Sequence, residues 1–435
     1  MDGKGKVIVG FVAALLLAPV VVWFIEAPFF GEGLSGLSRA LGRVTGFVGL
    51  TLLAVALVLG LKLRPLDQAF GGLNRQYYVH HVMAAIGFVL IVFHPLFSAA
   101  SALTFSAAEA LGVLFPRPME LATLAGWLAW LVFTAIVVTT FFLPVPHRGW
   151  RIVHVMSWPI FFVAWGHAVA LTFSGPLVAG ISLSYLLVLL VALTATGIRL
   201  VLLVIGPYRH EYVVTGKTVL SPKMVELRMQ PSDTRVDFAP GQFMYVRFED
   251  PEAGWHAAEY HPFTISSGIH DGDLAMTIKA LGDTSTRILD LDKGARARMH
   301  GPYGRFIPPV GSVKKQIWIG GGVGITPFLS AVRSMDGSRA DEIHLFYCED
   351  SAEGAVFLDE LGQAAERVEG LSLHPILADR DGYPTGKAIA ELSGGLEGAE
   401  VFLCGPGPMT AALQKDFKAL GLPRACLHSE EFSFF

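Results

Sequence analysis

Long apolar runs fill the first half of the chain, and short alternating runs fill the second half. From residue 208 onward, stretches such as 224–229 and 243–248 alternate apolar and polar positions, which predicts β-strands. Before that point, six runs are apolar and long enough to cross a membrane as helices. These predicted spans cover residues 7–25, 44–62, 79–99, 122–143, 152–173 and 179–204.

The polar half itself divides into two patterns. Several short strands separated by Pro and Gly clusters predict a small antiparallel β-barrel that ends near residue 311. From residue 316, strands alternate with helical segments, which indicates a parallel sheet of the nucleotide-binding type. The predicted fold is therefore a multi-domain membrane protein. Its parts are a six-helix transmembrane bundle (residues 1–207), an antiparallel β-barrel domain (208–311) and an α/β nucleotide-binding domain (312–435).

Composition narrows the class further. A chain of 435 residues that is 52% hydrophobic is too apolar for a soluble protein, and its net charge of −4 without a basic stripe argues against a nucleic-acid partner. Its three cysteines lie in the polar half without metal-ligand spacing, so we expect reduced thiols. Residues 1–18 resemble a signal peptide, but the apolar run continues to residue 25, which favours a first span over a cleaved leader.

Positive residues in the loops predict the orientation of the bundle. Lys and Arg are in excess at the N-terminus, in the second and fourth loops and after the sixth span, whereas the remaining loops dilute Arg with Glu. We therefore expect a multi-pass protein of the cytoplasmic (inner) membrane with both termini in the cytoplasm. The third and fifth spans then run in the same direction.

Those two spans each carry a histidine near either end: His80 and His94, fourteen residues apart, and His154 and His167, thirteen apart. Each spacing corresponds to roughly 20 Å along a helix, within the hydrocarbon core of a bilayer. Polar side chains at that depth are costly and usually functional. The pattern predicts two metal centres stacked across the membrane. Zinc would lack two of its four ligands, whereas a porphyrin iron needs only two axial imidazoles, so bis-histidine haem is favoured.

Helical geometry refines this choice. Fourteen residues bring a side chain back to within about 40° of its starting face, whereas thirteen miss by about 140°. The rule favours His80 over its neighbour His81 as the partner of His94, and it demands a local distortion in the fifth span, for which Pro159 is the expected cause. Candidate partners of haem propionates, which positive-inside anchoring would also explain, are Arg43, Arg75, Arg148 and Arg151.

In the predicted barrel, an extended segment that contains the hydroxyl of Thr264 would place hydrogen-bond donors along a flat ring. A lysine followed by small hydroxyl residues suits a pyrophosphate. The candidate binding residues are His261, Pro262, Phe263, Thr264, Lys279, Gly282, Asp283, Thr284, Gly301, Tyr303 and Gly304.

In the α/β part, a strand, a glycine loop and a helix follow one another. Glycines let the backbone approach a phosphate, whose charge the helix N-terminus stabilises. Ile325 stands where the dinucleotide fingerprint has its third glycine, so the loop does not match that fingerprint. The candidate residues of this loop, and of a second motif after a later strand, are Gly320, Gly321, Gly322, Gly324, Thr326, Pro327, Cys404, Gly405 and Pro406.

Taken together and in this order, these motifs resemble the NADPH oxidase and ferric reductase superfamily, in which a six-span haem domain is fused to a ferredoxin-reductase-like flavin and nicotinamide module. The resemblance covers almost the whole chain. It implies FAD, two haem b groups and NADPH or NADH as cofactors. The inner haem would be held by His80 and His154, and the outer haem by His94 and His167.

The resemblance also implies catalytic roles. Thr264 would lie at the reactive edge of the flavin, Cys404 near the nicotinamide, and Phe432, chosen over Phe435, on the flavin face where nicotinamide docks. One departure concerns Asp350, which stands where bacterial relatives often carry an arginine. A carboxylate repels a 2′-phosphate and accepts a bond from a ribose hydroxyl, so NADH remains open beside NADPH.

The expected function is a transmembrane NAD(P)H oxidase that passes electrons to dioxygen and forms superoxide. Ser98 replaces a histidine that animal oxidases carry one turn past the outer ligand, so oxygen handling cannot be carried over. Three alternatives stay open: a ferric or other metal reductase, an electron donor to a periplasmic partner protein, and a membrane-anchored flavin reductase without haem. We expect dioxygen or a ferric complex as the acceptor, contact with membrane lipid and no obligatory protein partner.

Overall fold

The computed structural model describes residues 33–115, 120–172, 179–205, 210–257, 259–309, 311–337 and 341–430, together with residues 10, 14 and 21. The chain forms two compact units, Met1–Gly206 and Pro207–Phe435.

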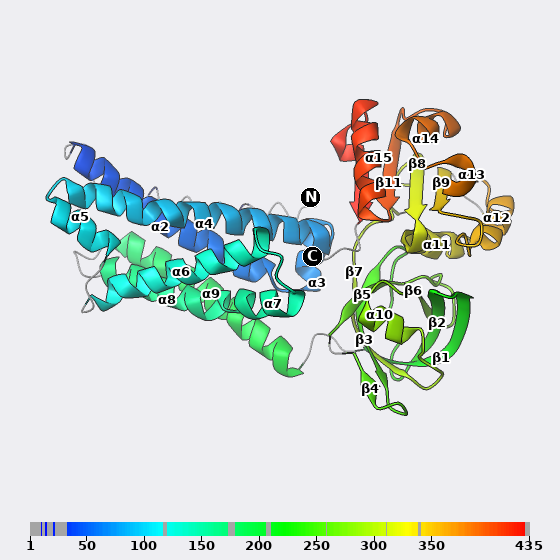
Figure 1. Ribbon diagram of the computed structural model, residues 1–435, viewed down its shortest axis with the longest axis horizontal. Coiled ribbons are helices and arrows are strands. Elements are labelled where there is room, and N and C mark those ends of the chain that lie inside the picture. Colours follow the sequence, from blue (N-terminus) through cyan, green and yellow to red (C-terminus); the bar gives the residue numbers. More distant parts are fainter. Residues whose placement is uncertain are drawn as a thin grey trace. The chain divides into compact units, whose positions relative to one another are not determined.

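The first unit is helical (Figure 1). Within its described residues, five helical segments are long and apolar enough to cross a membrane. The predicted first span, residues 7–25, lies outside the described residues except for three positions. The helices are α2 (Gly33–Leu59), α3 (Arg64–Phe70), α4 (Leu73–Leu103), α5 (Ala107–Leu114), α6 (Leu121–Phe141), α7 (His147–Val155), α8 (Ser157–Thr172) and α9 (Ala179–Ile205).

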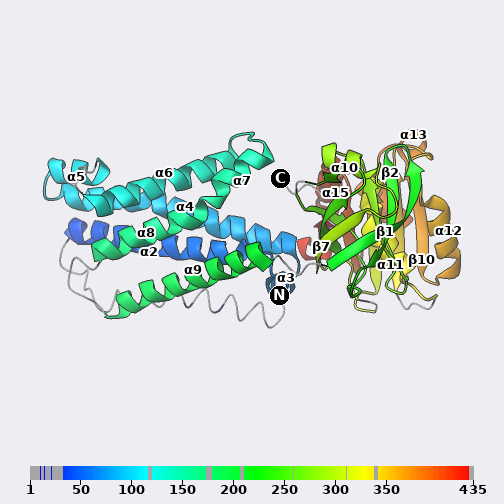
Figure 2. The ribbon, with the colours of Figure 1, turned by 90° about the horizontal axis from the view of Figure 1, so that it is seen from below.

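Helix α2 is the central helix of this unit. Its most apolar window is 67% buried, against 11 to 17% for the other four spans. Figures 1 and 2 both show α4 lying along α2. The bundle core includes Phe47 of α2, Phe133 of α6, Phe161 of α8 and Tyr185 of α9. The other spans leave large apolar side chains exposed, as lipid-facing helices do.

The second unit begins with an antiparallel sheet in the order β4-β3-β7-β1-β2-β6, with β5 paired to β3. A bridge between Ile265 and Met276 connects the end of β5 to β6 and closes the sheet towards a barrel. Its elements are β1 (His210–Ser221), β2 (Met224–Pro231), β3 (Phe243–Asp250), β4 (Trp255–His256), β5 (His261–Thr264), β6 (Leu274–Lys279), α10 (Asp283–Ile288) and β7 (Arg296–Tyr303).

A five-stranded parallel sheet follows, in the order β10-β9-β8-β11-β12. Its strands are β8 (Lys315–Gly321), β9 (Glu342–Glu349), β10 (Leu371–Leu377), β11 (Ala399–Cys404) and β12 (Leu427–Glu430). The connections are η1 (Gly322–Ile325), α11 (Thr326–Arg333), α12 (Leu358–Arg367), α13 (Ala378–Asp381), α14 (Gly386–Leu392), α15 (Gly407–Ala419) and η2 (Arg424–Cys426).

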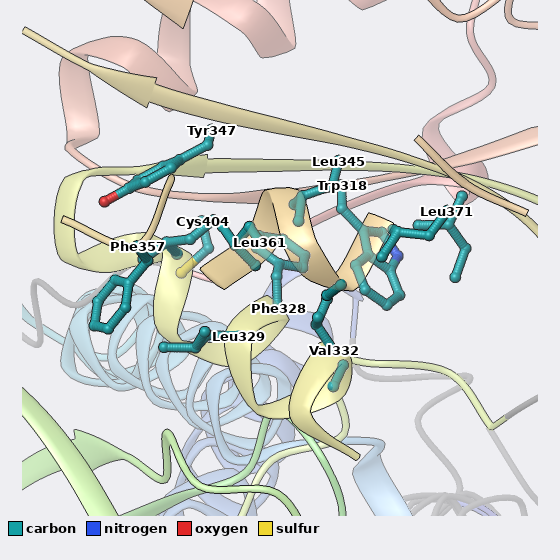
Figure 3. Packing of buried hydrophobic residues seen from close by; sticks show 14 of the residues in the cluster. Trp318, Phe328, Leu329, Val332, Leu345, Tyr347, Phe357, Leu361, Leu371 and Cys404 are labelled. Carbon is teal, nitrogen blue, oxygen red and sulfur yellow. The ribbon is translucent and has the colours of Figure 1, made fainter. Parts of the chain in front are cut away.

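The core on one side of this sheet packs against α11 and α12 (Figure 3). Trp318 of β8 stacks on Phe328 of α11 with ring centroids 5.4 Å apart, and Cys404 at the end of β11 belongs to the same cluster. Apolar helices, an antiparallel sheet and a parallel nucleotide-binding sheet therefore confirm the predicted fold class.

Candidate functional site

Four histidines of the helical unit form two pairs. The ring centroids of His80 on α4 and His154 on α7 lie 6.1 Å apart. Those of His94 on α4 and His167 on α8 are also 6.1 Å apart. We call these the 80/154 pair and the 94/167 pair. Fourteen residues of α4 separate them, which is about 20 Å of helix.

The separation within each pair is the one that a shared metal ion requires. An imidazole nitrogen binds a metal at about 2.0 Å, so two imidazoles on opposite sides of one ion have ring centroids roughly 6 Å apart. Within the described part of the chain, no three His, Cys, Asp or Glu side chains gather into a metal site. Each pair thus offers two ligands, which is what a haem iron takes from a protein. The residues present fit a haem at each pair.

Three of these histidines make the same contact with a neighbouring helix. We call the residues that they contact there a glycine seat. A glycine seat is a backbone carbonyl within hydrogen-bond distance of the imidazole Nδ1, followed four residues later by a glycine. The seats are Gly42 with Gly46 for His94 (2.7 Å from Nδ1 to the carbonyl oxygen), Ala56 with Gly60 for His80 (2.8 Å) and Ala122 with Gly126 for His167 (2.7 Å).

The glycine of a seat leaves room for the ring. A Cβ on Gly46 would lie 2.7 Å from Nδ1 of His94. One on Gly126 would lie 2.5 Å from Cε1 of His167. With Nδ1–H donating to the carbonyl, the imidazole is held in the neutral tautomer whose Nε2 keeps its lone pair for a metal.

His154 has no glycine seat. Its Nδ1 is buried and has no hydrogen-bond partner among the described residues. Its ring stacks on Trp150, with centroids 4.8 Å apart and an angle of 26° between the planes. Trp150 in turn donates from Nε1 to Oγ1 of Thr140 at 3.0 Å. The two histidines of the 80/154 pair therefore differ in their contacts, because only His80 has a carbonyl bonded to its Nδ1.

A break in the fifth predicted span separates the helices that carry His154 and His167. Helix α7 ends at Val155, and α8 begins at Ser157 after a turn at Met156. Pro159 has no N–H for the carbonyl of Val155, four residues earlier, so the helical hydrogen-bond ladder is interrupted here. The break provides the distortion that the thirteen-residue spacing demands.

The remaining predicted residues of this unit are His81 and four arginines. The ring of His81 lies 5.5 Å from that of His80 and 6.2 Å from Phe141, beside the 80/154 pair. Of the arginines predicted as propionate partners, the side chain of Arg148 is not described, and the exposed ones are Arg43, Arg75 and Arg151.

Sequence reasoning missed Arg199 on α9. Its guanidinium carbon lies 4.7 Å from the ring centroid of Trp158, and its charge acts on His154. A single charged residue inside the apolar run 179–204 was the signal that could have found it, because charges at membrane depth are usually functional.

In the barrel, the predicted flavin residues meet around Phe243 of β3. The buried Thr264 pairs with Phe243 from β5, and Tyr303 pairs with it from β7. A Cβ on Gly304 would lie 3.4 Å from the Phe243 ring and 3.6 Å from Oε1 of Glu430. The other predicted residues of β5 are His261, Pro262 and Phe263, and Gly301 lies in β7.

Two residues that sequence reasoning missed, Tyr245 and His300, form an aromatic cluster with the predicted Tyr303. His300 stacks on Tyr245 with centroids 5.0 Å apart and planes at 11°, and its Nδ1 lies 3.3 Å from the hydroxyl of Tyr303. Burial raises the pKa of Tyr245, so its phenol stays protonated. The Tyr303 ring stands at 74° to Tyr245 and 81° to His300, so the three rings form an edge-to-face cluster, and Tyr245 pairs with Pro262 of β5.

Lys279 ends β6 close to the glycine loop. Its Nζ lies 3.6 Å from the position of a Cβ on Gly322, and Oε1 of Glu349 lies 4.0 Å from the same position. Burial raises the pKa of the Glu349 carboxyl, and the Lys279 ammonium opposes that shift. Glu349 was not predicted, although an acidic residue at the carboxyl end of a parallel strand was a signal for it. The other candidates here, Gly282, Asp283 and Thr284, form the start of α10.

The glycine loop packs directly on the Cys404 motif. A Cβ on Gly324 would overlap the carbonyl of Cys404, and one on Gly321 would lie 3.1 Å from Pro406. The predicted residues Gly320 and Gly321 end β8, Gly322 and Gly324 form η1, and Thr326 and Pro327 begin α11. The glycine loop therefore leads directly into the N-terminus of α11, the kind of helix end that stabilises a phosphate.

Cys404 ends β11 and is followed by Gly405 and Pro406, after which α15 begins. Burial, with a smaller contribution from Glu430, raises the pKa of the Cys404 thiol well above its usual value of 9. The side chain is therefore a neutral thiol. Asp350 is exposed directly after β9, and Phe432 and Phe435 lie outside the described residues.

Arg333 of α11 joins the barrel to the nucleotide-binding sheet. It donates to Oε1 of Glu226 in β2 at 2.6 Å and to Oε1 of Glu360 in α12 at 2.6 Å. Nearby, the hydroxyl of Ser330 donates to the carbonyl of Ser267 at 2.8 Å. These bonds fix the helix after the glycine loop to the segment that follows β5.

Three protein-family models match the chain in the order of its parts. A ferric reductase like transmembrane component matches residues 45–165, an FAD-binding domain matches 214–305, and an oxidoreductase NAD-binding domain matches 318–415. The chain carries the domain architecture of the NADPH oxidase and ferric reductase superfamily. Three of the four paired histidines lie inside the first matched range, and His167 lies two residues past its end.

Curated relatives agree with this architecture. The ferredoxin reductase component of 3-ketosteroid-9-alpha-monooxygenase from Mycobacterium tuberculosis is 30% identical over 46% of this chain and 56% of its own length. A superoxide-generating NADPH oxidase heavy chain of Dictyostelium discoideum is 28% identical over 31% of this chain and 22% of its own length. The chain thus spans little more than half of the first relative and less of the second.

Among solved structures, flavohemoglobin from Malassezia yamatoensis with bound FAD and heme aligns with a TM-score of 0.50 at 17% identity, over 91% of this chain and 98% of that one. A likeness at this identity concerns the fold alone. The three family matches show that the chain is a membrane oxidoreductase with FAD-binding and NAD(P)H-binding domains.

Proposed function

We propose that this chain is a transmembrane NAD(P)H oxidase that carries electrons from NAD(P)H through FAD and two haem b groups to extracytoplasmic dioxygen, forming superoxide. The observation that carries the proposal is the equal separation of 6.1 Å in two histidine pairs at successive depths of the same bundle. Both pairs belong to one chain with the flavin and nicotinamide domains.

The electrons balance without a further reactant. One NAD(P)H gives up a hydride, which amounts to two electrons and a proton. Two dioxygen molecules each take one electron, so the products are NAD(P)⁺, one proton on the nucleotide side and two superoxide ions. Bound FAD supplies the exchange between a two-electron donor and one-electron carriers.

The chain's own residues position the reactants. The hydroxyl of Thr264 would orient the flavin edge, and the neutral thiol of Cys404 would face the nicotinamide without a charge that opposes hydride release. Lys279 and the amides around Gly322 would hold pyrophosphate. Phe432 would cover the flavin face and leave when nicotinamide docks.

We place the protein in the cytoplasmic membrane with both termini in the cytoplasm, because the loops rich in Lys and Arg share one side. Arg199 near the end of α9 acts on His154, so the 80/154 pair lies towards the end of the bundle from which the chain continues into the flavin unit. The 80/154 pair is therefore the centre that receives electrons, and the 94/167 pair the centre that releases them. We expect no obligatory protein partner.

Asp350 favours NADH over NADPH in this proposal, because its exposed carboxylate follows β9, where a 2′-phosphate would be repelled. Replacing Asp350 with Ser should lower the KM for NADPH and leave that for NADH within a few-fold. An unchanged ratio of the two KM values would show that another residue sets the preference.

The test of the proposal uses membranes that contain the full chain. With NADH or NADPH, reduction of a superoxide-sensitive dye should be abolished by superoxide dismutase. Negligible oxygen uptake together with rapid reduction of a ferric chelate would instead establish a ferric reductase, the second candidate, which the family match over residues 45–165 favours.

Two further experiments test the remaining alternatives, an electron donor to an outer partner protein and a flavin reductase without haem. Purified protein that turns over alone excludes an obligatory partner on the outer side. A bis-imidazole haem spectrum excludes a membrane-anchored flavin reductase, and replacing His94 with Leu should remove one haem of two. A spectrum unchanged by that substitution would contradict the assignment of the 94/167 pair.

A further inference from the structure

The two seat carbonyls on α2 have the same spacing as His80 and His94 on α4. On α2, the seat carbonyls of Gly42 and Ala56 are fourteen residues apart. On α6, fourteen residues after the seat carbonyl of Ala122 stands Ile136. The carbonyl of Ile136 thus has the place of the missing fourth seat, and the residue four positions later is Thr140, where the other seats have glycine.

Thr140 closes this fourth seat. Its Oγ1 donates to the carbonyl of Ile136 at 2.6 Å, the acceptor that an imidazole would have used, and accepts from Nε1 of Trp150 at 3.0 Å. Trp150 then presents its ring to His154 in a stack at 4.8 Å. His154 therefore contacts an aromatic ring, whereas each of the other three histidines contacts a carbonyl followed four residues later by a glycine.

The replacement changes the chemistry of one ligand. An imidazole that donates Nδ1–H to an acceptor is a more basic ligand and stabilises the higher oxidation state of its metal. His154 lacks such an acceptor in the described part of the chain, whereas His94 and His167 both have one. Arg199 adds a positive charge that acts on His154, and a nearby cation also favours the reduced metal.

We infer that the 80/154 centre is built to have a more positive reduction potential than the 94/167 centre, and that Thr140 and Trp150 are the positioning residues that set this difference. The inference rests on the proposed function, because it needs a haem at each pair. A receiving centre of this kind takes an electron readily from the flavin and holds it until an acceptor draws it onward.

The first experiment is a potentiometric titration of two single-centre variants, followed by visible spectroscopy. His94→Leu should leave the 80/154 centre and His80→Leu the 94/167 centre. The centre that remains in His94→Leu should have the more positive midpoint. Equal midpoints, or the reverse order, would overturn the inference while leaving the proposed function intact.

The second experiment opens the closed seat in the otherwise unchanged chain. Thr140→Gly removes the shorter of two hydroxyl bonds to the Ile136 carbonyl, at 2.6 Å against 3.1 Å from Thr139, and so makes this carbonyl a better acceptor for Nδ1 of His154. The more positive of the two midpoints should then move to lower potential and the other should not. Thr134→Gly on the same helix is the matched control, because the Thr134 hydroxyl bonds the carbonyl of Trp130, at 2.8 Å, and not that of Ile136. If Thr140→Gly retains both haems with both midpoints unchanged, the roles assigned to Thr140 and His154 are wrong.

A third pair of variants separates positioning by Trp150 from general stability. Trp150→Leu removes the stack, and we expect the 80/154 centre to lose its low-spin spectrum and to bind carbon monoxide. Trp150→Phe keeps a ring and should restore the low-spin spectrum. A low-spin 80/154 centre in the Leu variant would refute the role of the stack. Absence of any bis-imidazole spectrum in the unaltered protein would instead refute the proposed haem sites themselves.

Discussion

Replacing Gly126 with Ala should remove the haem that we propose for the 94/167 pair and spare the one that we propose for the 80/154 pair. The new Cβ would lie 2.5 Å from Cε1 and 2.6 Å from Nδ1 of His167, where ordinary contact begins at 3.4 Å. The imidazole must therefore retreat by about 0.9 Å. Such a shift would stretch the bond of 2.7 Å from its Nδ1 to the Ala122 carbonyl beyond hydrogen-bond distance.

The energy of this clash decides where the damage appears. Overpacking by one methyl group costs about 1–3 kcal/mol, and the lost hydrogen bond adds about 1 kcal/mol. A sum of roughly 3 kcal/mol shifts the equilibrium between the bound and displaced positions of the His167 ring by more than a hundredfold. The ring should therefore move away from the Ala122 carbonyl, and the helix should keep its shape. The Nε2 lone pair then no longer points at the metal position between His94 and His167.

Haem content per chain, measured as the pyridine adduct on purified protein, should fall from two to about one. Gly166→Ala is the matched control, because a Cβ there meets nothing within 4 Å although it neighbours His167. Gly60→Ala should also keep two haems, since its Cβ would lie an ordinary 3.8 Å from Cε1 of His80. Two haems with an unaltered spectrum in Gly126→Ala would refute the idea that the seat positions the ligand.

Three further outcomes concern the nucleotide-binding unit. Because burial raises the pKa of the Cys348 thiol to about 12 and that of Cys404 well above 9, both are protonated at pH 8 and should resist iodoacetamide until the chain is unfolded; rapid labelling of either, seen by mass spectrometry, would contradict their burial. Gly324→Ala should destabilise the fold by about 1–3 kcal/mol through overpacking, and the midpoint temperature of thermal unfolding should therefore fall. Gly362→Ala, in open space on α12, should not lower that temperature. Arg333→Met leaves a buried carboxylate without its partner, so the free energy of unfolding should fall by about 3 kcal/mol in a urea titration; a change below about 1 kcal/mol would show that this ion pair does not hold the barrel to the sheet.

Spacing along one helix carried the sequence prediction of the histidine pairs. The fourteen residues between His80 and His94 fixed both a depth and a face, and the misfit of thirteen residues in the next histidine span demanded a break, which occurs at Met156. These are properties of a single segment, so periodicity reveals them. The order of the domains was predictable for a similar reason, because each motif is local.

The glycine seats were not predictable, because they depend on the register between helices far apart in the chain. The seat of His94 begins 52 residues earlier, at Gly42. A glycine in an apolar helix has many explanations. Only the packed bundle shows which glycines lie against an imidazole ring. Likewise, the position of Glu349 at the end of a strand could be read from the sequence, but its closeness to Lys279 of the barrel and to the glycine loop exists only in the folded chain.

The residues at the four equivalent places support a role in positioning ligands over one in packing alone. Glycine costs a helix interior up to about 1 kcal/mol relative to alanine, so stability alone would place alanine at positions 46 and 126, inside α2 and α6. Gly60 follows the end of α2 at Leu59, where glycine has no such cost. Small residues also ease helix contact in membranes, but helix contact does not require an imidazole against the glycine. Threonine at position 140 breaks the series where the histidine has turned its ring to Trp150. At positions 46 and 126 a glycine lies against an imidazole whose Nδ1 is bonded to the carbonyl four residues earlier, and at position 140, where no such bond is made, glycine is absent. Ligand placement accounts for these three positions.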